Sequence, residues 1–197
     1  MTYSLEPAAA RIATLVGAVT EDQLDAATPC ADYTVRDLLG HLQGLTVAFR
    51  GAALRAPDPG GPDQQPGKLL ADDWRTLIPA RAAEMAEAWR DPDAWRGETA
   101  VGGLSMPAEL VGKIGLNELL LHGWDLASAI GRPFDADPAS VAASLEFTTL
   151  VNSPAWTVGR TGLFGDVVEV PADAPPLHRT LGLSGRNPHW GVDLKTT

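Results

Sequence analysis

The chain has 197 residues, enough for one compact domain with a sizeable core. Its 45% hydrophobic and 20% charged residues are ordinary for a soluble globular protein, and no apolar run approaches the ~20 residues of a membrane span. The formal net charge of −10 opposes binding to the phosphate backbone of nucleic acids. We therefore expect a single domain over residues 1–197, monomeric or homodimeric, with neither a nucleic acid nor a membrane as partner.

The N-terminus and the cysteine content indicate the compartment. Residues 1–6 lack the basic segment and following hydrophobic region of a secretory signal. Cys30 is the one cysteine and cannot form an internal disulfide, which agrees with a reducing environment. The sequence predicts a cytoplasmic protein.

Helical spacing of apolar residues dominates the first part of the chain. It predicts helices over residues 6–19 and 35–54, with a short helical turn over residues 21–26 between them. Thr34, followed three residues later by Asp37, is typical of a capping box and marks the start of the second helix.

The middle of the chain predicts two more long helices. Residues 56–67 are rich in Pro, Gly and polar residues and predict an exposed loop. A third helix is expected over residues 71–90, a short hairpin within residues 95–106, and a fourth helix over residues 107–130 that ends at Gly131. The third helix should face the core with Trp74, Leu77, Ile78, Ala82, Met85 and Trp89.

The last part of the chain predicts one further helix and a tail. Asp137 should cap a helix that runs to about Val151, and residues 175–183 predict a helical turn or two. We expect an all-α four-helix bundle with an additional helix and a mostly irregular C-terminal tail, about residues 157–197, that packs on the bundle.

Glu118 and His122 place a carboxylate and an imidazole one turn apart on the fourth helix, which is otherwise apolar on nearly all faces. Side chains at i and i+4 point the same way, so both groups can reach one point. A buried, unpaired carboxylate is costly and requires a partner. One interpretation is an ion pair or hydrogen bond with His122 or an arginine, and the other is a divalent metal site.

A metal site needs a third ligand, and the other candidates are His41, Cys30, His178 and His189. His41 lies at the edge of the apolar stripe of the second helix, where it could be a structural residue or a ligand. Helical spacing alone does not bring His41 near His122.

The other candidates have simpler interpretations. Cys30 precedes a helix N-terminus, which can favour a thiolate, but we interpret it as a small buried apolar residue and assign it no catalysis. His178 and His189 are expected at the surface, although His189 and Trp190 could cover the mouth of a pocket if the tail packs back.

Two segments carry a family resemblance. Residues 28–42 (TPCADYTVRDLLGHL) and 118–127 (ELLLHGWDLA) look like the two signature helices of the DinB-like metal-binding superfamily. They resemble most closely the branch related to the N-terminal domain of mycothiol-dependent maleylpyruvate isomerase. Residues 170–175 (VPADAP) and 185–190 (GRNPHW) are similar to the tails of actinobacterial members of that branch.

The resemblance implies a DinB-like four-helix bundle in which His41, Glu118 and His122 bind a divalent metal, with water completing its coordination. Tyr33 departs from the pattern, since relatives usually carry tryptophan there. Two imidazoles and one carboxylate leave open coordination positions, as in catalytic zinc sites. Zinc is the first candidate, and nickel or iron(II) suits the same ligands.

The resemblance further implies a function in which the metal activates a low-molecular-weight thiol such as mycothiol. The thiol would be transferred to a small electrophile or used in its isomerisation. Asp125, close to His122 on the same helix, could orient a ligand imidazole or accept a proton from the nucleophile, or could simply hydrogen bond to the helix or a neighbouring loop. The alternatives are a non-catalytic metal or small-ligand binding protein, and a hydrolase that uses metal-bound water.

Overall fold

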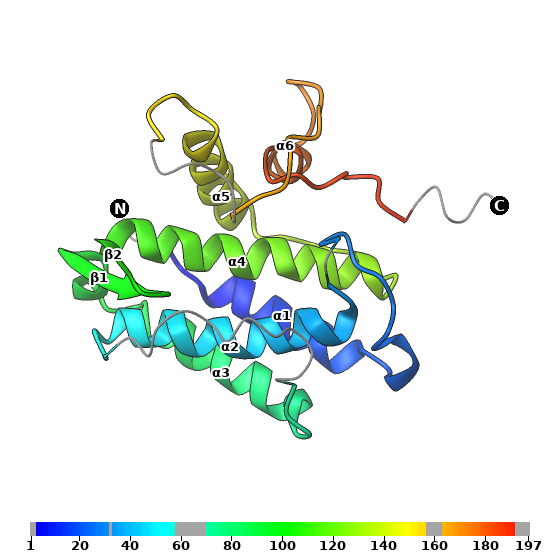
Figure 1. The fold of residues 1–197 in the computed structure, drawn as a ribbon, viewed down its shortest axis with the longest axis horizontal. Helices are drawn as coiled ribbons and strands as arrows, with labels where there is room; N and C mark the ends of the chain where they lie inside the picture. The colour runs from blue at the N-terminus through cyan, green and yellow to red at the C-terminus, as the bar shows by residue number, and fades with distance from the viewer. Residues whose placement is uncertain (1–2, 32, 58–69, 157–162, 192–197) are drawn as a thin grey trace.

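The fold is all-α apart from one hairpin, as the sequence predicts. The computed structural model describes residues 3–31, 33–57, 70–156 and 163–191 (Figure 1). The long helices of the bundle are α1 (Glu6–Ala18), α2 (Val35–Ala53), α3 (Trp74–Ala88) and α4 (Ala108–Ala129). α3 packs on α1 and α2, and α4 packs on the other side of the same two helices.

A second layer lies on the opposite side of α4. α5 (Pro138–Val151) contacts α4, and α6 (Pro176–Leu183) contacts α5. Figure 1 shows α5 and α6 above α4, with α1, α2 and α3 below it. α4 is therefore the central element, which explains why it is buried on nearly all faces. None of the helices in the described ranges is long and apolar enough to cross a membrane.

The short elements connect the helices. The turn after α1 is a 3-10 helix, η1 (Glu21–Gln23), and another, η2 (Pro92–Trp95), follows α3. The predicted hairpin is confirmed: β1 (Glu98–Val101) pairs with β2 (Leu104–Pro107) in antiparallel register directly before α4. The predicted loop over residues 56–67 lies mostly outside the described residues, as do residues 157–162 and 192–197 of the tail.

The helix ends follow the predicted chemistry at two sites. Thr34 and Asp37 form the capping box of α2, since the Asp37 amide donates to the Thr34 hydroxyl at 3.2 Å and the Thr34 amide donates to the Asp37 carboxylate at 3.0 Å. Gly131 stops α4 with a φ of 66°, a left-handed conformation that favours glycine. These contacts fix the beginning of α2 and the end of α4.

The third helix is shorter than predicted. It begins at Trp74 instead of residue 71 and contains Pro79 without ending there. Leu77, expected in the core, is only half-buried, because the buried stripe of this helix follows Trp74, Ile78 and Ala82 at spacings of four. Leu77 lies beside that stripe.

Gly112 is the point at which two tryptophans reach α4. The rings of Trp89 and Trp95 lie 5.0 Å apart, and a Cβ at Gly112 would lie 2.5 Å from Trp95 and 2.9 Å from Trp89. Both indoles are buried and their Nε1 atoms donate to backbone carbonyls, so neither ring can easily shift. We expect Gly112→Ala to lower the free energy of unfolding by about 1–3 kcal/mol, measured by urea denaturation.

Gly44 provides the matched control, because it lies inside α2 and a Cβ added there would meet no atom within 4 Å. Gly44→Ala should leave stability unchanged or raise it by about 0.5–1 kcal/mol through helix propensity alone. Equal effects of the two substitutions would contradict the close packing at Gly112.

Candidate metal centre

Three side chains meet where α2 packs against α4. His41 lies on α2, and Glu118 and His122 lie one turn apart on α4. Oε2 of Glu118 is 3.2 Å from Nε2 of His41 and 3.2 Å from Nε2 of His122. The two imidazole rings stand nearly perpendicular, with centroids 4.8 Å apart. The fold thus brings together two histidines that helical spacing alone could not relate.

The donor atoms of this cluster have the spacing of metal ligands. Atoms that bind one ion at about 2.0–2.2 Å with angles near 100° lie roughly 3.0–3.4 Å apart. The two Nε2 to Oε2 distances fall in that range, and all three donor atoms lie within 4.8 Å of one another. The cluster could therefore hold a metal ion.

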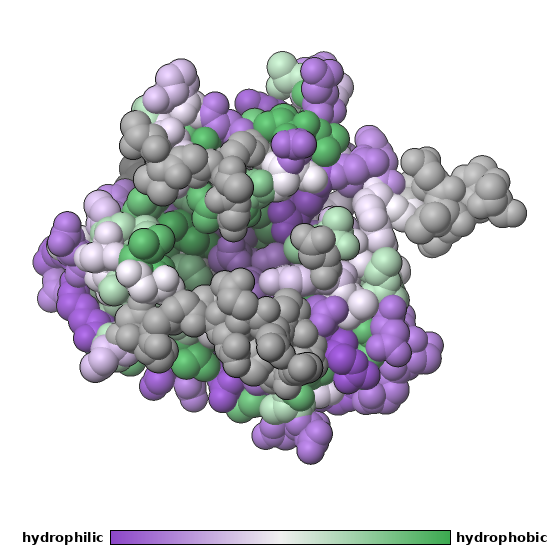
Figure 2. Space-filling model, in the orientation of Figure 1, coloured by the Kyte–Doolittle hydropathy of each residue, from purple (hydrophilic) through white to green (hydrophobic). Residues whose placement is uncertain are grey.

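The cluster is partly open to the outside. The side chains of His41 and Glu118 are 25% and 21% exposed, whereas that of His122 is 9% exposed. The side chains of His41 and Glu118 therefore present surface that a small molecule can reach. Figure 2 shows a hollow on one face of the molecule, between the α5 and α6 layer and the bundle, with hydrophilic residues at its base and hydrophobic residues along one side.

Asp125 extends the cluster inward, from the same helix. Its carboxylate is fully buried, and Oδ2 accepts a hydrogen bond from Nδ1 of His122 at 3.0 Å. Arg186 closes the other side, with Nε and a terminal nitrogen donating to the two carboxylate oxygens at 2.8 and 2.7 Å. Asp125 therefore contacts the imidazole of a candidate ligand, the contact that one of the sequence interpretations requires, and both of its oxygens accept hydrogen bonds from His122 or Arg186.

Arg186 was missed by the sequence reasoning. It lies 61 residues after Asp125, in an irregular segment beyond α6, and it is one of twelve arginines in the chain. The sequence indicated only that Asp125 needs a partner, since a buried aspartate on an apolar helix requires a cation nearby. That requirement identifies no particular arginine.

The charges of the cluster follow from these contacts. Burial alone would raise the pKa of Glu118, but hydrogen bonds with His122 and His41 outweigh it and hold that pKa far below its usual range. Burial alone would lower the pKa of His122, yet its contacts with Asp125 and Glu118 raise the pKa to about 9. An imidazolium at His122 thus balances the neighbouring carboxylates. A divalent ion held by the same donors would supply positive charge in its place.

Two residues of the segment before α2 border the cluster. The ring of Tyr33 lies 5.5 Å from that of His41, so it forms part of the wall around this ligand candidate. Cys30, expected to be a small buried apolar residue, is half-buried, because it lies in the irregular connection before α2 and not in the bundle. Its sulfur lies within 4.8 Å of donor atoms of His122 and Asp125.

The histidines of the tail lie apart from the three donors. The rings of His178 and His189 contact each other with centroids 5.7 Å apart, and His189 is exposed as predicted, whereas His178 is half-buried. Trp190 packs against the small apolar cluster of Leu121, Trp124 and Leu181. The tail thus packs back on α4 through Trp190.

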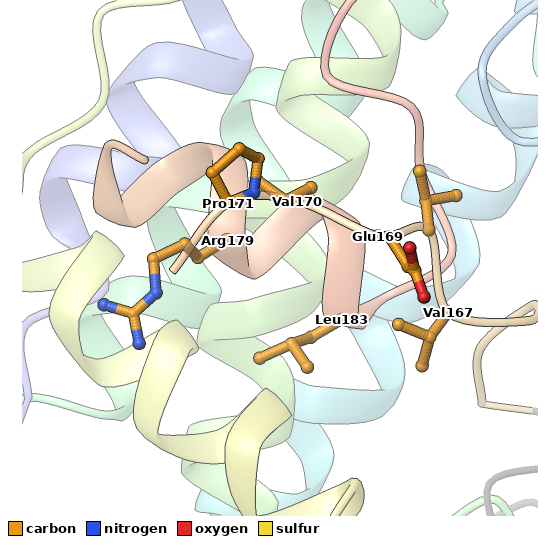
Figure 3. Close-up of a pocket in the computed structure, with 7 residues that line it drawn as sticks. Val167, Glu169, Val170, Pro171, Arg179 and Leu183 are labelled. Atoms are coloured by element: carbon orange, nitrogen blue, oxygen red, sulfur yellow. The ribbon is translucent and has the colours of Figure 1, made fainter. Parts of the chain in front are cut away.

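A second cavity, of about 620 Å³, lies along α6 and the segment before it (Figure 3). Its lining is mainly aliphatic, with Glu169 and Arg179 as the charged residues, and it includes none of the metal-ligand candidates. The His41, Glu118 and His122 cluster lies outside this cavity and is the candidate metal site.

Comparison with known proteins identifies the family of the chain. Residues 5–127, more than half of the chain, match the family of the mycothiol maleylpyruvate isomerase N-terminal domain. The chain belongs to this family. The resemblance noted in the sequence is thereby confirmed, and the all-α bundle is consistent with the DinB-like fold that it implied.

The relatives extend the similarity beyond the family domain. Uncharacterised proteins from two strains of Mycobacterium tuberculosis are each 28% identical to the chain over 175 residues, which covers 88% of this chain and 91% of the relative. No solved structure gives a significant match. His41, Glu118, His122 and Asp125 lie inside the region matched by the family, whereas Arg186 lies outside it.

Proposed function

We propose that the protein is a divalent-metal-dependent enzyme that activates a low-molecular-weight thiol for transfer to, or isomerisation of, a small electrophile. His41, Glu118 and His122 are the proposed metal ligands, and a mycothiol-like thiol is the proposed cosubstrate. Zinc is the first candidate for the ion, and nickel or iron(II) suits the same donors.

The convergence of three donors on one accessible point carries this proposal. A closed structural zinc site uses four protein ligands, whereas three donors of this kind leave room for an exogenous ligand. His41 and Glu118 are the more exposed members, so an exogenous ligand would reach the site from their side. When bound there, a divalent cation lowers the pKa of a coordinated thiol and makes it nucleophilic near neutral pH.

The protein's own residues have separate parts in this proposal. Glu118 contributes the one negative charge among the proposed ligands, and it is held by the two imidazoles at 3.2 Å. His122 uses Nε2 toward the site and Nδ1 toward Asp125, which fixes the orientation of its ring. Asp125 acts on the site through His122.

Mycothiol is the first thiol to test, because the family takes its description from a mycothiol-dependent isomerase. The metal-loaded protein should consume mycothiol in the presence of a generic electrophile, and the loss of free thiol measures this reaction. Glutathione and cysteine should be used poorly. Glu118→Gln should reduce this turnover by at least about 100-fold, because the charged ligand is lost. Glu98→Gln, an exposed position on β1, is the matched control and should retain activity.

Two results would replace the proposal by another function. Tight binding of a small ligand without thiol-dependent turnover would identify a binding protein. Turnover of an ester or amide that proceeds equally well without any thiol would identify a hydrolase.

A further inference from the structure

Asp125 and Arg186 form a buried ion pair directly beside His122, one of the proposed ligands. Asp125 has no exposed surface and Arg186 is 8% exposed. Two parallel hydrogen bonds join the guanidinium to the carboxylate, the geometry in which arginine binds carboxylates most strongly. The two bonds fix the orientation of the Asp125 carboxylate, which in turn contacts His122.

Oδ2 of Asp125 is shared between two donors. It lies 3.0 Å from Nδ1 of His122 and 2.7 Å from a terminal nitrogen of Arg186, while Oδ1 receives the Nε of Arg186. Both carboxylate oxygens are thus engaged, so Asp125 is held in place as an acceptor for Nδ1. In a metal-bound state Nδ1 would keep its proton toward Asp125, and Nε2, the nitrogen that faces Glu118, would present its lone pair.

Arg186 is itself held by the segment that follows α6. Its backbone amide donates to the carbonyl of Leu181 at 2.9 Å, and Leu181 packs against Leu121 and Trp124 of α4. Gly185 approaches the backbone of Gly165 so closely that a Cβ would lie 2.8 Å from it. This docking places the guanidinium against Asp125 of α4, from a part of the chain beyond the family domain.

We propose that Arg186 is a positioning residue that locks Asp125 onto Nδ1 of His122 and so determines that Nε2 is presented to the metal. In the same way it keeps Asp125 from becoming a fourth protein ligand, which preserves the open positions of the site. This inference rests on the proposed metal site. It adds that the segment beyond residue 127 completes the support of that site.

Cobalt(II) binding tests the inference, because cobalt reports both affinity and coordination through its visible absorption. Arg186→Met should bind cobalt about 10–100-fold more weakly than the wild type, as expected when the support of a ligand histidine is lost. Its ligand-field bands should also shift, because Asp125 is freed to approach the ion. Arg186→Lys keeps the charge but not the two parallel hydrogen bonds. Its cobalt affinity should therefore lie between those of the wild type and Arg186→Met.

Arg75→Met is the matched control. Arg75 pairs with Glu21 at 2.8 Å and stacks on Trp74, away from the cluster, so its loss should leave cobalt affinity and spectrum unchanged. Urea unfolding of each metal-free variant establishes that the protein titrated is folded. If the Asp125 and Arg186 pair only stabilised the fold, the Arg186 variants would change the unfolding curves but not the cobalt affinity or spectrum.

The outcomes separate the inference from the function on which it rests. A folded Arg186→Met protein with wild-type cobalt affinity and spectrum would overturn the role of Arg186. If this variant does not fold, Arg186→Lys decides, since wild-type binding by it would overturn the role and weaker binding with shifted bands would support it. A wild-type protein that binds no cobalt, zinc, nickel or iron(II) would overturn the metal site itself.

Discussion

The purified protein is expected to hold about one divalent metal ion per chain, and His41→Ala or His122→Ala is expected to abolish this binding. Each substitution removes one of three donors that converge within 4.8 Å, and the two that remain cannot retain an ion in competition with water and buffer. Elemental analysis after gel filtration measures the stoichiometry directly.

His178→Ala is the matched histidine control for this experiment, because His178 contacts His189 in the tail and takes no part in the cluster. It should retain the ion. Stoichiometric metal in both the His41 and the His122 variant would refute the ligand assignment, and loss of metal in all three would indicate general destabilisation.

The second large effect concerns stability. Asp125→Leu should lower the free energy of unfolding of the metal-free protein by about 3–5 kcal/mol, because the guanidinium of Arg186 is left buried without its partner. Urea denaturation followed by circular dichroism measures the change. The double variant Asp125→Leu with Arg186→Met removes both charges and should recover most of the loss, since an apolar pair of similar size tolerates the same burial.

A double variant no more stable than Asp125→Leu alone would show that the instability arises from packing or from His122 instead of from the unpaired charge. If the double variant recovers stability, it should still bind metal poorly, because Nδ1 of His122 has no acceptor. Stability and metal affinity would then be separated in one protein.

The parts of the fold that the sequence predicts well are those controlled by local interactions. The capping box of Thr34 and Asp37 and the left-handed Gly131 depend on neighbours in the chain, so their residue types are sufficient to locate the ends of α2 and α4. The predicted start of α3 is wrong by three residues, because no side chain caps this helix at Asp73 and the boundary is set by packing.

In the candidate site, too, the sequence predicts what depends on one helix and not what depends on packing between elements. The common direction of Glu118 and His122 follows from the pitch of one helix, but the approach of His41, 77 residues before Glu118, depends on how α2 packs on α4. In the sequence, only the family resemblance indicates that approach. Arg186 belongs to an irregular segment with no periodicity, and its position depends on the docking of α6, which residue spacing does not encode.

The central position of α4 has a consequence for motion. To open locally, this helix would have to separate from the α1 and α2 side and from the α5 side at once, so its amides should exchange with solvent only in the rarest fluctuations. Two of the three donors are on this element, and the third enters from the adjacent α2. The backbone positions of Glu118 and His122 should therefore be among the least mobile in the described part of the chain, which hydrogen exchange would measure.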